Sequence, residues 1–134
     1  MYKVHFWIAD QDGQGWLRVE QVQRYLNKIC GNEVKATYNN YMRPNEWVIQ
    51  DASGHRQNAF DLTVHQRQYA DSSLQNLRYL QKQLKVPCVY EIDDYLHGLS
   101  PHAPAYSNYH NPQTKVHTFN NINAYLQESA AITV

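Results

Sequence analysis

Short runs of β-branched and aromatic residues alternate in this chain with segments whose apolar residues recur every three or four positions. The first pattern is typical of strands and the second of amphipathic helices. Strand-like runs cover residues 4–9, 33–38, 60–64, 88–92 and 130–134, with a shorter one at 46–50. Helical periodicity covers residues 17–29, 71–84 and 114–129. This alternation predicts βαβ units, and therefore a Rossmann-like α/β fold with a mainly parallel sheet and helices on both faces.

Turn and capping residues separate these segments. Gly31 ends the first predicted helix, Asp71 or Ser72 is expected to cap the second, and Pro87 opens the strand that follows. Residues 96–112 contain three prolines and are expected to form a long ordered loop. The inward faces of the first and last helices are expected to carry Val19, Val22, Leu26, Ile29, Val116, Phe119, Ile122 and Leu126.

Composition limits the class of protein. The 134 residues predict one domain spanning 1–134, and 43% of them are hydrophobic, which is enough for a packed core. The net charge is zero, so the composition lacks the excess of basic residues that is typical of nucleic-acid-binding proteins. No apolar run has the length that is needed to cross a bilayer. The two cysteines, Cys30 and Cys88, lack metal or redox spacing. We expect a cytoplasmic protein with reduced thiols, no membrane contact and no nucleic-acid partner.

Ligands of parallel α/β sheets bind beyond the carboxyl ends of the strands. After the first strand, Gly13 and Gly15 precede Trp16 and Arg18 at the start of a helix. Two glycines let the backbone approach a phosphate or a sugar hydroxyl, and the helix N-terminus supplies free N–H groups. The turn lacks the third glycine of the dinucleotide motif and the Lys-Ser/Thr of a P-loop, so a plain tight turn remains an equal alternative.

The same turn is a near match to a calcium loop. Asp10, Asp12 and Gln14 occupy liganding positions, but Gln21 stands where a bidentate glutamate is needed. We therefore expect no calcium there, and no metal or cofactor elsewhere. The four histidines at 97, 102, 110 and 117 have no zinc spacing.

Two further strand ends carry candidate chemistry. His65 could be a general base toward an acceptor hydroxyl, with Arg67 as an anion contact, although a plain surface histidine is an equal alternative. Asp93 and Asp94 could bind a metal or act as acid and base. Neighbouring residues of an extended strand point to opposite faces, so these two carboxylates need not share a target. The alternative is that one caps the loop and the other is solvated.

Several of these motifs occur in an order that resembles a known family. They are Asp10, Gly13, Gly15, Trp16 and Arg18; Gln66 and Arg67 after an Asp-apolar strand; residues 87–94 with Val-Tyr-Glu-Ile-Asp-Asp; Leu99, Pro101, Pro104 and Tyr106; and residues 130–134. Together they resemble the N-terminal domain of GT-B fold glycosyltransferases of the kind that bacteriophages often encode. The resemblance covers nearly the whole chain. Residues 21–23 depart from it, because the family often has a proline there.

The resemblance implies one half of a GT-B fold, on the acceptor side of an interdomain cleft. The intact enzyme would move a sugar from a nucleotide sugar to an acceptor hydroxyl. Gly13, Gly15, Trp16, Arg18, Arg67, Asp93 and Asp94 would face the cleft, and His65 would be the base. The family's second domain holds most nucleotide-sugar contacts, so the chain alone is expected to be inactive and to bind that domain or itself. The alternative is a stand-alone phage module, reusing the half-fold to bind another protein.

Overall fold

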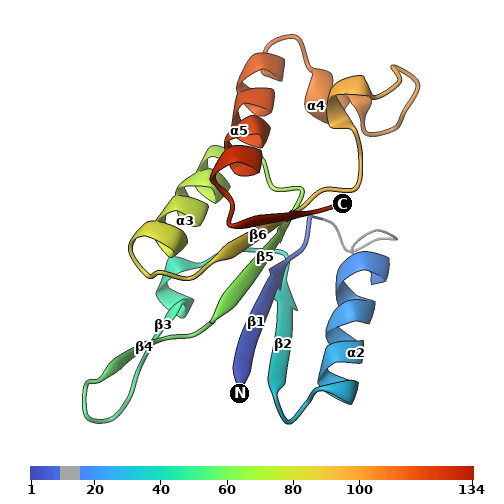
Figure 1. The fold of residues 1–134 in the computed structure, drawn as a ribbon. Helices are drawn as coiled ribbons and strands as arrows, with labels where there is room; N and C mark the ends of the chain where they lie inside the picture. The colour runs from blue at the N-terminus through green and yellow to red at the C-terminus, as the bar shows by residue number, and fades with distance from the viewer. Residues whose placement is uncertain (10–15) are drawn as a thin grey trace.

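The computed structural model describes residues 1–9 and 16–134, with the backbone alone at Trp16. Five parallel strands form the main sheet in the order β2-β1-β5-β6-β7 (Figure 1). Their bounds are β1 Tyr2–Trp7, β2 Val34–Asn39, β5 Leu62–Gln66, β6 Cys88–Glu91 and β7 Ala131–Thr133. The predicted parallel sheet is thus confirmed, with strand ends that differ from the expected ones by up to two residues.

Helices cover both faces of this sheet. The π-helical turn η1 (Trp16–Glu20) leads into α2 (Gln21–Ile29), which lies on one side (Figure 1). On the other side lie α3 (Asp71–Lys82) and α5 (Lys115–Glu128) (Figure 1). None of the helices in the described ranges has the length and apolar character needed to cross a bilayer.

The direction of winding reverses between β1 and β5. From β1 the chain crosses through α2 to β2, and from β5 it crosses through α3 and α5 in the opposite direction to β6 and β7. Right-handed crossovers in opposite directions place their helices on opposite faces, as Figure 1 shows. The fold is therefore Rossmann-like, and its topological switch point, where such folds bind ligands, lies between β1 and β5.

A small hairpin is inserted in the connection from β2 to β5. After the 3-10 turn η2 (Pro44–Glu46), β3 (Val48–Gln50) pairs antiparallel with β4 (Arg56–Asn58). In the turn that joins these two strands, Gly54 has a φ of 85°, a left-handed conformation that glycine adopts without a Cβ penalty.

Strand alternation divides the core into two layers. His5 and Trp7 of β1 lie on the α3 side, where the cluster of Leu77, Leu80, Cys88, Tyr90 and Tyr125 is almost fully buried. The intervening side chains lie on the α2 side, in a smaller cluster made of Phe6, Ile8, Val19, Ala36 and Val64. The sheet is therefore buried on both faces at its centre, with apolar side chains on the α2 face and His5, Thr63 and His65 among the buried side chains of the α3 face.

Two predicted helix faces are partly wrong. Val22 and Ile29 of α2 are 41% and 59% exposed, whereas Val19 is buried. On α5, Val116 is 73% exposed, whereas Phe119 and Ile122 are buried. Periodicity identifies the helix, but the sheet covers only part of each apolar stripe, so some residues of the stripe remain in solvent.

The predicted cap of α3 is also wrong. Ala70 occupies the N-cap position and no side chain caps the helix. Asp71 instead lies within 2.6 Å of His117 Nε2 and accepts a hydrogen bond from Asn121 Nδ2, which links α3 to α5.

Residues 96–112 are not one long loop. They contain the 3-10 turn η3 (Leu96–Gly98) and the short helix α4 (Tyr106–His110). Leu96 and Tyr109 pack with Phe119 of α5 in a third buried cluster, which anchors this segment beside the carboxyl end of the sheet (Figure 1). Both cysteines are free thiols; Cys88 is buried and Cys30 half-buried.

Candidate functional site

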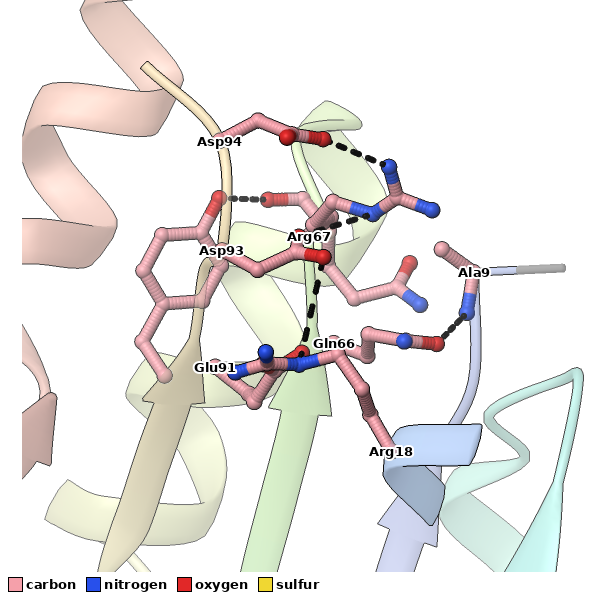
Figure 2. A network of polar contacts seen from close by, with 9 residues as sticks. Ala9, Arg18, Gln66, Arg67, Glu91, Asp93 and Asp94 are labelled. Atoms are coloured by element: carbon pink, nitrogen blue, oxygen red, sulfur yellow. Dashed lines mark hydrogen bonds and ion pairs between the residues drawn. The ribbon is translucent and has the colours of Figure 1, made fainter. Parts of the chain in front are cut away.

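An ion pair closes the carboxyl end of β6. The Arg18 Nε of η1 donates a hydrogen bond to Oε1 of Glu91, the last residue of β6 (Figure 2). Asp93, two residues further, places its Oδ2 3.9 Å from the same Nε. The side chains of Glu91 and Asp93 are 8% and 9% exposed and that of Arg18 is 32% exposed. The pair is therefore shielded from water on the carboxylate side and open on the guanidinium side.

Arg67 contributes a second guanidinium from the end of β5. Its Nε lies 3.8 Å from Asp93 Oδ1, and its Nη1 donates to Asp94 Oδ2 at 3.3 Å (Figure 2). The two aspartates therefore share Arg67, although only Asp93 also approaches Arg18. The backbone of Arg67 is in the left-handed region, with a φ of 45°, which a non-glycine residue adopts at a cost of about 1 kcal/mol. A hydrogen bond from Arg67 N to Glu91 O, 2.9 Å long, holds it there.

Glutamines attach the end of β1 to this cluster. The Gln66 Oε1 accepts a hydrogen bond from Ala9 N at 3.0 Å (Figure 2). The Gln68 Nε2 donates to Ile8 O at 3.4 Å. Tyr90 Oη donates to Gln68 O at 3.0 Å. The switch point between β1 and β5 is thereby fixed by side chains of β5 and β6, so the edge is preformed.

The cluster has one more negative than positive charge, counting three carboxylates and two guanidiniums. Burial raises the pKa of Glu91, and the hydrogen bond and charge of Arg18 oppose that rise. Three buried polar atoms make no hydrogen bond to any described residue: Gln66 Nε2, Glu91 Oε2 and Asp93 Oδ1. Buried polar atoms usually have partners, and these three supply one donor and two acceptors for a ligand.

Beside the cluster, on the α3 side, lies a polar pocket of about 180 Å³. None of the described residues that line it is charged. Its polar lining consists of Asn40, Tyr41, Gln68, Ser72, Ser73 and Asn76. These side chains come from the segment after β2, the segment after β5 and the first turns of α3. The pocket thus lies at the switch point. Its residue Gln68 directly follows Arg67 of the cluster in the chain.

His65 does not lie in this site. Its ring is fully buried, with Nε2 3.1 Å from Thr63 Oγ1 and Nδ1 3.3 Å from the hydroxyl of Tyr125. Burial lowers its pKa from 6.5 to about 3, so the ring is neutral. A general base must reach the proton that it removes. The structure makes His65 a core residue on the α3 face, and we correct its expected role as the base.

The structure therefore unites four of the predicted site residues: Arg18, Arg67, Asp93 and Asp94. Gly13, Gly15, the side chain of Trp16 and the calcium-like positions Asp10, Asp12 and Gln14 lie outside the described residues. Among residues 1–9 and 16–134, no three His, Cys, Asp or Glu side chains are placed to hold a metal ion.

Sequence reasoning missed Glu91 and Gln66. Glu91 lies inside a strand-like run, where a polar residue is easily taken for a solvent-facing one, and Gln66 lies two residues beyond the expected end of its strand. The available signal was the alternation of side chains along a strand. By this alternation Glu91 lies on the same face as Val89 and Asp93, and Gln66 lies on the same face as Val64. Each is a polar residue on an otherwise apolar face, at the end of its strand.

The comparisons with known proteins do not show a family for this chain. No protein-family model matches the chain, and no curated protein matches it. Among solved structures, it is similar to a conserved protein from Enterococcus faecalis V583, with 10% identity and a TM-score of 0.47, over 99% of this chain and 91% of the other.

Proposed function

We propose that this chain is the acceptor-side domain of a GT-B type glycosyltransferase, and that the switch-point edge binds the hydroxyl groups of the acceptor. The observation that carries the proposal is the uncharged polar pocket beside the carboxylate and arginine cluster. Amide and hydroxyl side chains both donate and accept, so they suit a sugar whose hydroxyl groups do the same.

The charges of the cluster favour an acceptor over a donor at this edge. A nucleotide sugar carries a negatively charged diphosphate, which three carboxylates against two guanidiniums would repel. A neutral polyol meets no such repulsion, and it can pair with the open positions of Gln66 and Asp93. In the proposed enzyme the diphosphate would be held by the other domain, as the resemblance to GT-B enzymes implies.

The proposed base is a carboxylate of the cluster. Asp94 has a side chain that is 45% exposed and lies at the rim of the edge, so an acceptor hydroxyl can reach it. Arg67 contacts both Asp93 and Asp94 and would orient them. Carboxylates serve as general bases when held within hydrogen-bond reach of the hydroxyl.

The test is an NMR titration of the ¹⁵N-labelled chain with a panel of neutral mono- and disaccharides, and with UDP- and GDP-sugars in parallel. We expect at least one neutral sugar to shift the amides of Asn40, Gln68 and Ser72. The Asn40→Ala and Ser72→Ala variants should weaken this binding severalfold, because each removes a polar side chain of the pocket. Asn123→Ala, exposed on α5, is the matched control.

Nucleotide release from the same donors is followed with the chain alone. We expect no turnover, because transfer requires donor and acceptor to be held together in one closed cleft. Tight binding of a nucleotide sugar to the pocket, or no response to any neutral sugar, would contradict the proposal.

A further inference from the structure

A groove of about 520 Å³ lies on the face of the sheet that α2 covers incompletely. Its floor is formed by the outward side chains of neighbouring strands, Phe6, Val64 and Val89, and one wall by Val22 of α2. Pockets for small organic ligands have this volume and are mostly apolar with a few polar groups. Because the lining comes from four strands, the turn η1 and the helix α2, the shape exists before a ligand binds.

One end of the groove is polar. Arg18 and Glu91 are the charged residues among its lining. Glu91 is 6% exposed, and its Oε2 is buried and accepts no hydrogen bond from a described residue. The Arg18 Nε donates to Glu91, and the Arg18 side chain as a whole is still about a third exposed. The polar end of the groove therefore holds an acceptor that lacks a donor among the described residues, Glu91 Oε2, and a guanidinium that has further N–H groups.

We propose that this groove binds a small neutral amphiphile, with an apolar ring or chain on the strands and a hydroxyl group between Glu91 and Arg18. A hydroxyl can donate to Glu91 Oε2 and accept from Arg18 at the same time. A carboxylate head would be repelled by Glu91 and an ammonium head by Arg18, so the paired charges select a neutral head. The apolar side chains then supply binding energy by losing contact with water.

This inference goes beyond the proposed function and does not depend on it. The groove lies on the α2 face, whereas the polar pocket lies on the α3 face, so a chain that binds no sugar could still bind the amphiphile. The cluster of Arg18 and Glu91 borders both sites, but no described residue lines both the groove and the polar pocket. Shifts at Asn40 and Ser72 therefore report the pocket, and shifts at Val22 and Thr133 report the groove.

The experiment compares three naphthalenes that differ only in their head group: 2-naphthol, 2-naphthoate and 2-naphthylmethylammonium. Calorimetry gives the three dissociation constants, and NMR shift changes map the site. We expect 2-naphthol to bind at least tenfold more tightly than either ion, with shifts at Val22, Val89 and Thr133. Equal binding of all three, or shifts elsewhere, would overturn the inference.

Variants test the two ends of the groove separately. Val22→Glu places a charge on the exposed wall and should weaken 2-naphthol binding at least tenfold, while Val116→Glu on α5 should have no effect. Glu91→Gln should reduce the preference for 2-naphthol over 2-naphthoate, because the repelling charge is gone. Thermal unfolding checks that each variant is folded. A Glu91→Gln variant that is folded and keeps the full preference would overturn the assigned head group.

Sedimentation velocity of the unliganded chain tests the rival occupant, a second copy of the chain. We expect the same sedimentation for the wild type and Val22→Glu. A dimer that dissociates on adding 2-naphthol or on introducing Val22→Glu would show that the groove serves self-association, and would overturn the inference.

Discussion

Arg18 and Glu91 form an ion pair across 73 positions of the sequence, joining the turn before α2 to the end of β6. Burial raises the pKa of Glu91, and the hydrogen bond and charge of Arg18 oppose this rise, so the arginine favours the ionised form of a buried carboxylate. The pair therefore ties the turn before α2 to the carboxyl edge of the sheet, and it does so at the candidate site.

Replacing Arg18 with Met should lower the free energy of unfolding by about 2 kcal/mol at pH 7.5. Loss of one partner from a fully buried pair costs about 3–5 kcal/mol, and the exposure of Arg18 reduces that figure. The loss should shrink as the pH falls, because a protonated Glu91 no longer requires a cation. Urea unfolding followed by tryptophan fluorescence measures both effects.

Arg43→Met is the control for this change. Arg43 pairs with Glu46 at 3.6 Å, and both side chains are well exposed. Exposed pairs contribute less than about 1 kcal/mol. The double variant Arg18→Met/Glu91→Gln should recover most of the lost stability. Equal losses for Arg18→Met and Arg43→Met would show that burial of Glu91 has no energetic role.

Acid should destabilise the domain through two buried histidines. Burial lowers the pKa of His5 to about 4 and that of His65 to about 3. Both are depressed below the unfolded value of 6.5, so the unfolded chain binds more protons and stability falls as the pH drops below 6.5. Each histidine should account for about 2 kcal/mol between pH 7.5 and 5. Glu91 acts in the opposite direction, because its pKa is raised, and offsets part of the loss.

The His65→Gln variant checks this assignment. The difference in unfolding free energy between pH 7.5 and 5 should be about 2 kcal/mol smaller than in the wild type, whatever the absolute stability of the variant. His55→Gln, which replaces an exposed histidine, should leave the difference unchanged. A pH dependence that His65→Gln does not alter would assign the acid sensitivity to other groups.

Two residues of the α5 stripe, Val116 and Ile122, should respond differently to truncation. Ile122 is fully buried, so Ile122→Ala should cost about 2–5 kcal/mol through lost burial and the cavity it leaves. Val116 is 73% exposed, and Val116→Ala should change stability by less than about 0.5 kcal/mol. Denaturant midpoints measure the two changes. Similar costs at both positions would mean that Val116 is covered in solution.

Substitution of Gly54 should reveal the conformation of the hairpin turn. With a φ of 85°, Gly54→Ala should cost about 1 kcal/mol, because a Cβ disfavours the left-handed region. Gly54→Asn should cost less, since asparagine tolerates that region better. Thermal unfolding compares the two variants, and an identical melting temperature for alanine and glycine would contradict the turn geometry.

Alternation of strand and helix patterns was sufficient to predict the parallel sheet and the edge where its polar residues gather. Arg18, Arg67, Asp93 and Asp94 meet there because the carboxyl ends of parallel strands share one edge. The sequence could not show that Glu91 is the partner of Arg18, because pairing across 73 residues depends on the sheet order and not on any local pattern.

The misassigned role of His65 has a specific origin. The strand was expected to end at residue 64, which would place the histidine in a loop, but β5 continues to Gln66. Two more residues of regular strand put His65 on the same face as Thr63 and opposite Tyr125. Strand ends depend on pairing with neighbouring strands, which β1 and β6 provide here and which no local pattern contains.

The hairpin between β2 and β5 has a consequence for the rate of folding. Pairing of Val4 in β1 with Leu62 in β5 closes the long loop of chain between these two strands. This closure costs conformational entropy before any contact compensates for it. A hairpin forms within about 1–10 μs, well before such distant strands meet. By drawing Val48 and Asn58 together, β3 and β4 shorten the free part of that loop. Weakening the hairpin should therefore slow refolding more than it speeds unfolding, even though the hairpin lies outside the main sheet.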